Sequence, residues 1–387
     1  MRARWQHLRR DERGMSLVFV GLGFMGFLAA TTLAIDVGML MTAKSQAQNA
    51  ADAGALSGAI ALVFNDYDNR SASGPAVQGA INAATANVVM GTAGSVTPTD
   101  VTFPLGPGGE NNRVKVVVRR MTSRSNPVAT LFGPLFGVPT VDILAEATAE
   151  ASPADAATCV MPFTIPDRWE EKQTAPWDPN DDEFDMFDSH GDPVATPDVY
   201  VPVGSTSPPP TGYDADRDRG MMVVLKNNNQ NKTAPSFYNP WRLPGSSGGD
   251  DYRTNIGECN TNIVGIGDPM EPETGNMVGP TTQGIEDLIA KDPNAYWDTG
   301  CNCVQGSDYG KSPRIAVIPL YDPVYYETGK HNGNTASLRV ANYLGFFIVG
   351  LSGNEVVGRI TPVTGLVRGG GGPIPTGAFA KAIRLVE

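Results

Sequence analysis

The sequence predicts an α+β protein with a long N-terminal transmembrane helix, a small α+β unit and then an irregular, β-rich domain. Three observations predict this organisation. Residues 15–35 contain no charged side chain. The chain has 44 glycines and 31 prolines, and 18% of its residues are charged, which favours short strands joined by many turns. Runs that alternate apolar with polar residues recur after residue 100, as in strands with one buried face.

The apolar segment Met15–Ile35 has 21 residues. At about 1.5 Å per residue a helix of this length spans roughly 31 Å, which matches the hydrocarbon core of a bilayer. A cleaved signal peptide, with Thr32 and Ala34 before the cut, is the alternative. The segment is longer than the roughly 7–15 apolar residues of a signal peptide, so we expect an uncleaved anchor.

Arginines precede the apolar segment and indicate its orientation. Residues 1–14 carry five arginines and two acidic residues, which are Arg2, Arg4, Arg9, Arg10, Arg13, Asp11 and Glu12. Because basic flanks stay on the cytoplasmic side, we expect residues 1–14 to be a cytoplasmic tail and everything after Asp36 to lie outside the cytoplasmic (inner) membrane.

The external part is acidic. From Asp36 onward it carries 24 basic and 39 acidic side chains, a formal charge of −15. Nucleic acid is therefore not an expected partner, because binding it requires a basic face that displaces counterions from phosphates. An acidic surface that keeps an external domain in solution accounts for this charge.

All four cysteines follow the apolar segment: Cys159, Cys259, Cys301 and Cys303. An even number outside the cytoplasm predicts two disulfides. Of the three possible pairings we rank Cys301 with Cys303 lowest, because one intervening residue forces a strained ring. A four-cysteine zinc site is a weaker alternative, since the chain lacks paired Cys-x-x-Cys spacing.

The helix is expected to continue from the membrane segment to residue 64, because Asp36–Phe64 contains no proline and many alanines. Small residues fall four apart and share one helix face, at Gly26, Ala30, Ala34 and Gly38. Such a face lets another helix approach closely. Two interpretations remain: a helix that packs against partner helices, or an alanine-rich spacer that the protein's own domain covers.

The runs ERGMSLVF and AIDVGMLMTAKSQAQNAADAGALSGA, within residues 11–62, resemble the N-terminal segment of the TadE/TadG-like family of Flp (Tad) pilus assembly proteins. The resemblance rests on Gly14 after a basic stretch, Asp36 at the end of the apolar span, and Asp52 in the Gln- and Ala-rich continuation. Phe19 stands at the fifth position after Gly14, where type IV prepilins have glutamate. The Asp-x-Ser-x-Ser motif of a von Willebrand A domain does not occur in the sequence.

The resemblance implies a membrane-anchored structural or assembly subunit of a Tad/Flp-type pilus machine, which contributes to cell adhesion and whose N-terminal helix contacts other subunits. It also implies a pilin-like external α+β unit, which we place at residues 65–151. An anchored surface or periplasmic binding protein that depends on calcium is the alternative function.

Within residues 65–151 the pattern predicts a helix over 75–90 and strands over 101–103, 113–121 and 141–149. The connection Pro127–Pro139 is unusually apolar. We expect it to pack into the core, and contact with the membrane surface or with a partner subunit is the alternative.

Residues 152–387 are expected to form the irregular β-rich domain. Its candidate strands are 221–225, 314–320, 338–349, 355–360 and 378–386, with Gly369–Gly372 as a turn before the last one.

The sequence contains two short matches to catalytic or cofactor-binding patterns, and neither lies in the structural context that its pattern requires. The GLGFMG run at residues 21–26 matches a dinucleotide-binding pattern but lies inside the apolar span. Gly245, Ser247 and Gly249 match a hydrolase elbow, yet loop residues flank them on both sides. We therefore expect no catalytic residue and no cofactor apart from calcium.

Acidic loop residues are the candidate calcium ligands, since carboxylates crowded without basic neighbours repel each other unless a cation joins them. They are Asp181, Asp182, Asp185, Asp214, Asp216 and Asp218. The last three begin like a calcium-binding loop, but Gly220 comes one position late and Leu225 replaces the closing glutamate. A solvated loop is the alternative.

Overall fold

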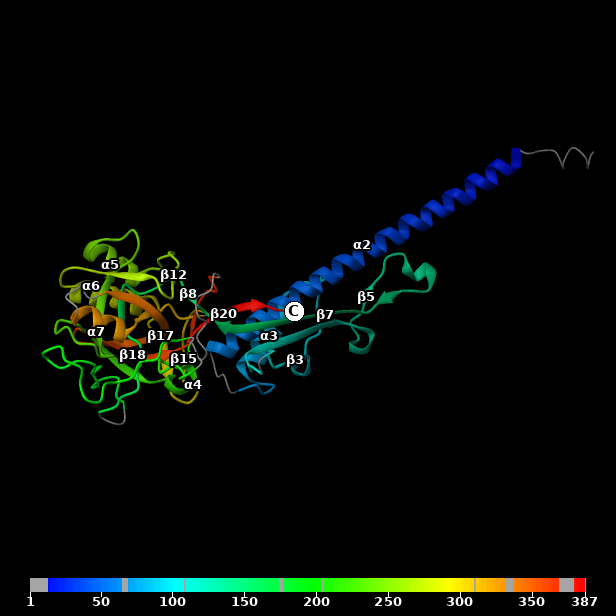
Figure 1. The fold of residues 1–387 in the computed structure, drawn as a ribbon. Coiled ribbons are helices and arrows are strands. Elements are labelled where there is room, and N and C mark those ends of the chain that lie inside the picture. Colours follow the sequence, from blue (N-terminus) through cyan, green and yellow to red (C-terminus); the bar gives the residue numbers. More distant parts are fainter. Residues whose placement is uncertain are drawn as a thin grey trace, which may run out of the picture. The chain divides into compact units, whose positions relative to one another are not determined.

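The computed structural model describes residues 13–64, 69–107, 109–173, 177–203, 205, 207–309, 311–331, 337–368 and 379–386. The chain forms two compact units (Figure 1). The first unit contains residues 1–58, 77–149 and 385–387, and the second contains residues 59–76 and 150–384. From the sequence we expected the corresponding boundary after Ala151. The predicted cytoplasmic tail lies almost entirely outside the described residues, and the predicted turn Gly369–Gly372 lies outside them completely.

One helix, α2 (Arg13–Phe64), contains both the apolar segment and its alanine-rich continuation. It runs for 52 residues, so the expected extension beyond the membrane segment is confirmed. Alanine and leucine favour helix, and proline does not occur between its ends.

The first unit places one short helix and several short strands beside α2. Its elements are α3 (Pro75–Ala86), β1 (Val88–Val89), β2 (Thr92–Ala93), β3 (Val101–Thr102), β4 (Arg113–Arg120), β5 (Val128–Ala129), η3 (Gly133–Phe136), β6 (Thr140–Val141) and β7 (Ile143–Pro153). Within the sheet, β4 lies between β3 and β7. All three predicted strand regions are occupied by strands, and β7 continues to Pro153 in the second unit.

The helix predicted over 75–90 ends earlier, at Ala86. Val88 and Val89 pair instead with Thr92 and Ala93 in a tight hairpin. Its two turn residues, Met90 and Gly91, have φ angles of +50° and +75°. Two successive positive φ values give a turn that matches strand twist, and glycine at the second position makes it accessible.

The core of the first unit forms where β4 and α3 meet the second half of α2. Alternate residues of β4 are buried, including Val114, Val116 and Val118. A Cβ at Gly54 of α2 would lie 2.9 Å from the Ala84 Cβ and 3.0 Å from the Ala80 carbonyl oxygen. Glycine therefore allows α2 and α3 to approach closely.

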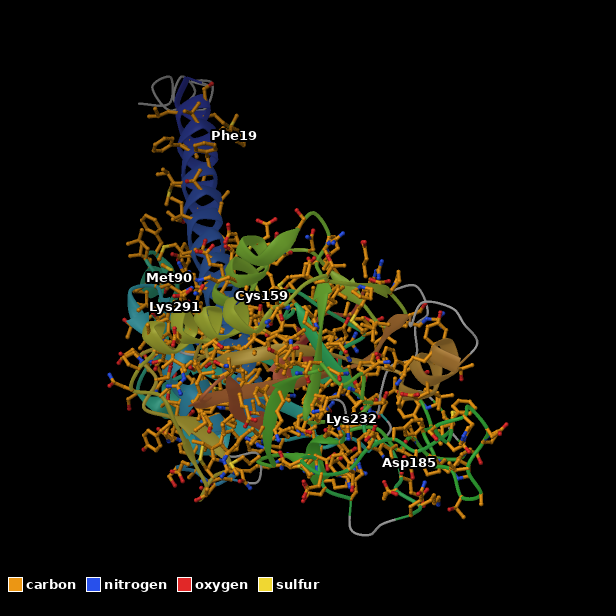
Figure 2. The ribbon with its side chains drawn as sticks, turned by 90° about the vertical axis from the view of Figure 1, so that its left-hand side faces the viewer. Phe19, Met90, Cys159, Asp185, Lys232 and Lys291 are labelled. Atoms are coloured by element: carbon orange, nitrogen blue, oxygen red, sulfur yellow. A yellow bond between two sulfur atoms is a disulfide. The ribbon has the colours of Figure 1, made fainter. Side chains whose placement is uncertain are left out.

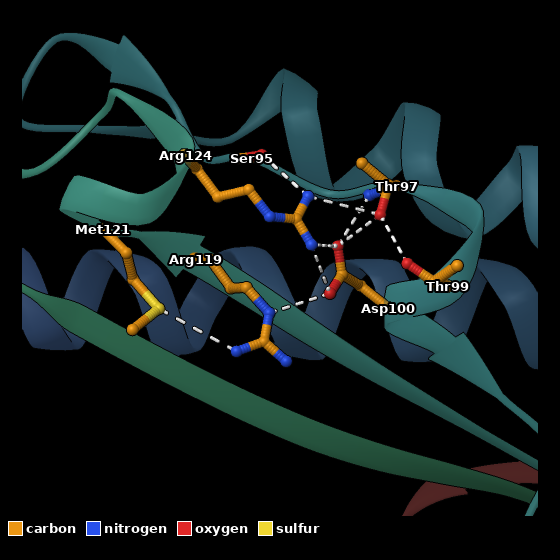
Figure 3. A network of polar contacts seen from close by, with 7 residues as sticks. All are labelled: Ser95, Thr97, Thr99, Asp100, Arg119, Met121 and Arg124. Atoms are coloured by element: carbon orange, nitrogen blue, oxygen red, sulfur yellow. Dashed lines mark hydrogen bonds and ion pairs between the residues drawn. The ribbon is translucent and has the colours of Figure 1, made fainter.

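A buried carboxylate joins three segments of the first unit (Figure 3). Asp100 accepts hydrogen bonds from Arg119 Nε at 2.8 Å, from Arg124 at 3.1 Å and from the Thr97 hydroxyl at 2.7 Å. Burial would raise the pKa of Asp100, but these hydrogen bonds and the charge of Arg124 outweigh it and lower the pKa below 3.8. The ionised carboxylate thus fixes the turn before β3 against the end of β4.

The second unit is built on a closed six-stranded barrel. Its strands are β9 (Phe163–Pro166), β10 (Met222–Asn227), β11 (Phe237–Arg242), β16 (Ile315–Tyr321), β17 (Leu338–Ser352) and β18 (Glu355–Thr361). They pair in the order β10-β18-β17-β16-β9-β11, and β11 pairs again with β10. The pairs β10–β11 and β9–β16 are parallel, and the other four are antiparallel.

Each of the five candidate strand regions of this unit contains a strand, and the last of them is β20 (Ala380–Leu385). The β-rich domain that we expected is confirmed, and six of its strands close into a barrel. Helices α5 (Gly248–Gly257) and α6 (Val278–Lys291) pack together, and Gly284 lies directly against Ile256. Both faces of β16 are buried, with Ile318 in one apolar cluster and Val317 in another.

Two disulfides join the four cysteines, which confirms their number. Cys159 pairs with Cys259 and Cys301 pairs with Cys303. The low rank that we gave to the second pairing was wrong. Asn302 has a φ of +48°, a left-handed conformation that asparagine tolerates, and the Cα atoms of its neighbours are 5.2 Å apart, within the usual disulfide range.

A second buried carboxylate, Asp167, follows strand β9 and holds a long loop. It is fully buried and accepts hydrogen bonds from the Tyr213 N–H at 3.0 Å and from the Tyr200 hydroxyl at 3.2 Å. Burial raises the pKa of Asp167 to about 6, although these hydrogen bonds oppose the shift. A Cβ on Gly212 would lie 2.6 Å from its carboxylate, so only glycine fits there.

The pKa shifts of Asp100 and Asp167 have opposite directions, so we expect them to change the free energy of unfolding with pH in opposite ways. For Asp100 the folded state lowers the pKa, so its contribution to stability is present above pH 3.8 and is lost as the pH falls through the folded value. We expect Asp100→Asn to lower the local unfolding free energy at pH 7 by roughly 2 kcal/mol, with the difference shrinking towards pH 3. Hydrogen exchange of β4 in the full chain measures this, and equal protection at pH 7 would contradict it.

For Asp167 the folded state raises the pKa, so the folded state binds more protons and stability falls as the pH rises from 3.8 to about 6. The variant Asp167→Asn lacks this titration. Between pH 4 and pH 7 the free energy of unfolding of this variant should therefore rise, relative to that of the wild type, by on the order of 2 kcal/mol. Exchange protection of β9 at both pH values is the readout, and parallel pH profiles of variant and wild type would refute the assignment.

Candidate membrane anchor and helix-packing site

The first part of α2, residues 14–35, is not covered by other described parts of the chain. Residues 14–35 are exposed apart from half-exposed Thr31 and Thr32, and the most apolar 18-residue window has a mean hydropathy of 2.1 with no residue buried. Figure 2 shows side chains such as Phe19 projecting from this part of the helix. Its length and composition are consistent with a single-pass membrane anchor.

The small-residue stripe of this helix is also open. Gly26, Ala30, Ala34 and Gly38 are all exposed. A Cβ added at Gly26 or at Gly38 would meet no atom of the described chain within 4 Å. Because nothing described covers the stripe, the backbone of a second helix could approach it closely.

Residues 43–58 of α2 are built into the first unit and are largely covered by it. The buried residues of this part lie three, four and seven apart and include Ala43, Ala47, Ala50 and Ala51. The two interpretations of the alanine-rich helix therefore apply to different parts of it. The protein's own unit covers the part after residue 42, and the stripe before residue 39 remains open.

Polar residues of the family-like segment hold the sheet on the helix. The Gln48 side chain donates to the Glu146 carbonyl oxygen of β7 and to Asp52, each at 2.9 Å. The Gln46 side chain accepts a hydrogen bond from the Met90 N–H at 2.7 Å. Asp52 thus orients a glutamine that binds β7. Gly14, by contrast, is exposed at the start of α2.

Asp36 has a distinct position. It is the first buried side chain of α2, with 7% of its surface exposed, and it directly follows the apolar segment. Its carboxylate accepts hydrogen bonds from the N–H groups of Leu131 at 2.8 Å and Phe132 at 3.1 Å. Asp36 was singled out only by the family resemblance. Nothing in the neighbouring sequence indicated that it would bind Leu131 and Phe132, which lie 95 and 96 residues away.

Those partners belong to the apolar connection, which we now call the apolar hairpin, residues 127–141. Strands β5 and β6 form its stem and η3 its tip. The expectation of core packing was wrong for the tip, where Leu131, Leu135, Phe136 and Val138 are 59%, 78%, 61% and 48% exposed. Only near the stem is a side chain fully buried, that of Val128.

The candidate calcium ligands do not converge. Among the described residues, no three acidic, histidine or cysteine side chains are placed to hold a metal ion together. Asp218 is buried and forms ion pairs with Arg168 and with Arg217, the latter at 2.8 Å. The Asp216 side chain lies outside the described residues, and calcium binding stays a prediction.

The remaining candidates lie in the loop before β10. Asp181 is exposed, while Asp182 and Asp185 are half-buried. Burial, and then the charges of neighbouring acids such as Glu183 and Glu171, raise the pKa of Asp185. Lys232 forms an ion pair with Glu183 at 2.8 Å and offsets part of this repulsion.

Two shallow hollows lie on the second unit, with volumes of about 320 and 400 Å³, and both are lined by Pro272 and Leu338. Their charged side chains are engaged with each other. Arg242 binds Glu271 at 3.0 Å and Glu273 at 3.1 Å, and this pairing lowers the pKa of Glu273.

Comparison with known proteins agrees with the anchor. No curated protein and no solved structure matches the chain. The resemblance seen in the sequence is nevertheless confirmed over its N-terminal segment, because residues 14–61 match the model of the putative Flp pilus-assembly TadE/G-like family.

Proposed function

We propose that this protein is a membrane-anchored structural or assembly subunit of a Tad/Flp-type pilus machine. The observation that carries the proposal is the agreement between the family match over residues 14–61 and the fold of the same residues. Within that match, residues 14–35 of α2 are exposed and apolar, and residues 43–58 are built into the first unit.

The proposed location is the cytoplasmic membrane, with the N-terminus inside and both units outside. The five arginines before residue 14 support this orientation. Two disulfides in the second unit support it independently, because disulfides persist in oxidising compartments outside the cytoplasm.

The proposed role is contact, without a catalytic step. In lipid, apolar helices gain no hydrophobic drive to associate, so small residues that allow close backbone approach become the favoured contact. The open stripe Gly26, Ala30, Ala34 and Gly38 fits such a contact with helices of other pilus-machine subunits.

A double substitution separates insertion from contact. Leucine at both positions, Ala30→Leu with Ala34→Leu, raises apolarity and should leave membrane insertion intact. The added side chains should block helix approach and reduce cross-linking to partner subunits by about tenfold. Membrane fractionation and cross-linking through α2 are the two measurements.

The variant Gly21→Leu is the matched control, because at 3.6 residues per turn Gly21 lies on the side of α2 opposite Ala30. It should keep both insertion and cross-linking. Unchanged cross-linking in the double variant would show that the stripe is not an interface.

Deletion of the gene tests the wider assignment. Cells without this protein should lose surface pili and adherence, because an assembly subunit cannot be bypassed by the remaining machine. Electron microscopy of the cell surface and an adherence assay measure this, with the wild-type gene restored as control. Normal piliation of the deletion strain would overturn the proposed function.

A further inference from the structure

The apolar hairpin presents a continuous uncharged surface at the point where α2 leaves its apolar segment. Residues 127–141 contain no charged side chain, and Asp142 is the first to follow. Its four exposed apolar side chains, those of Leu131, Leu135, Phe136 and Val138, gather within eight residues. An exposed patch of this kind indicates a surface that is covered by something else.

The position of the tip is fixed by Asp36. Two backbone N–H groups of the hairpin donate to this carboxylate, which belongs to the first residue after the apolar segment. Thr31 and Thr32 are half-buried, whereas residues 14–30 are exposed. Figure 1 shows the hairpin of β5 extending beside α2 towards its N-terminal end. The tip therefore lies at the level where the apolar segment ends.

The stem is fixed as well. The buried Arg120 side chain donates to the carbonyl oxygens of Asn126 at 2.9 Å and Pro127 at 3.1 Å. The strands pair through Val128 with Val141 and Ala129 with Thr140. Held at both ends, the hairpin presents its tip in one defined place.

Most backbone N–H groups of the tip have an acceptor within the chain, which lowers the cost of placing this segment against lipid. The Thr130 N–H donates to the Pro139 carbonyl, and the Val138 N–H to that of Gly133, at 3.1 and 2.9 Å. The Leu135 and Gly137 N–H groups donate within the η3 turn. Leu131 and Phe132 donate to Asp36, and Pro134 has no N–H to satisfy.

Gly133 and Gly137 make this compact turn possible. A Cβ on Gly133 would lie 2.2 Å from the Val138 carbonyl oxygen, and Gly137 has a φ of +78°. The turn therefore directs its apolar side chains outward, because its interior is filled by backbone.

From these observations we infer that the apolar hairpin is a second membrane contact, in which Leu131, Leu135, Phe136 and Val138 enter the interfacial layer of the bilayer beside α2. The inference rests on the proposed membrane anchor. We infer that lipid covers this patch, because Asp36 holds the patch beside the end of the apolar segment. A bilayer that surrounds the apolar segment therefore also reaches the hairpin. Exposed apolar side chains on a turn whose backbone N–H groups are mostly paired suit a segment that enters the interfacial layer.

Photo-cross-linking of the full chain in bilayers tests this inference. The photoreactive residue p-benzoylphenylalanine replaces Phe136 in one sample, Val88 in a second and Phe24 in a third. The bilayers contain phosphatidylethanolamine, phosphatidylglycerol and an alkyne-tagged phosphatidylethanolamine that reports lipid adducts. Val88 is the matched control, because it is 54% exposed and its hairpin is held by Gln46, ten residues and about 15 Å further along α2 than Asp36.

Position 136 should give lipid adducts at a yield about tenfold above that of position 88 and comparable with that of position 24. Adducts at position 24 but not at position 136 would overturn the hairpin contact and leave the anchor intact. Absence of adducts at both positions would overturn the anchor as well. Adducts of position 136 with a second copy of the chain would replace lipid by protein as the occupant and equally overturn the inference.

Asp36→Ala tests the positioning role of the carboxylate. With the photoreactive group at position 136, the lipid adduct yield should fall several-fold, because the tip loses both hydrogen bonds to α2. Asp52→Ala serves as control, since Asp52 contacts Gln48 and not the hairpin. Equal yields in the Asp36→Ala and Asp52→Ala samples would show that Asp36 does not hold the tip at the membrane.

Discussion

The carboxylate of Asp36 separates two environments along one helix. Before it, α2 offers only apolar and small side chains and is not covered by the described chain. After it, α2 becomes the central support of the first unit, with small residues against α3 and with glutamines bonded to the β1–β2 turn and to β7. A charged carboxylate is costly inside hydrocarbon, so its position limits how far α2 can sink into a bilayer. Its two hydrogen bonds bring the hairpin to the same level.

The close packing in the second half of α2 depends on side-chain size. Alanine and glycine allow α3 to approach until Gly54 has no space for a Cβ, and Val116 of β4 lies against the same glycine. The same residue types before Asp36 face no partner in the described chain. Small residues thus serve one physical purpose, close backbone approach, within the protein in one half of the helix and with other molecules in the other.

The sequence predicted the parts of the fold whose signals are local. The uncharged run predicted α2, alternating apolar residues predicted β4 and β18, and longer apolar runs predicted β16 and β17. The barrel could not be predicted because β9 and β11 carry prolines, and their pairing with distant strands leaves no local pattern. The disulfide between Cys301 and Cys303 depends on a left-handed Asn302, which spacing alone does not reveal. Likewise, we expected the hairpin to pack into the core because the sequence shows that it is apolar but does not show that its tip is exposed.

The two proposed contacts of the first unit are geometrically compatible. At about 100° per residue, Asp36 lies roughly 120° around α2 from Ala30 and about 160° from Gly38. The hairpin therefore reaches α2 on a side away from the stripe, which agrees with the open space around Gly38. A partner helix on the stripe and lipid beneath the hairpin do not compete for the same surface. Because the hairpin, β7 and α2 are joined by hydrogen bonds, a contact made by either surface also orients the other.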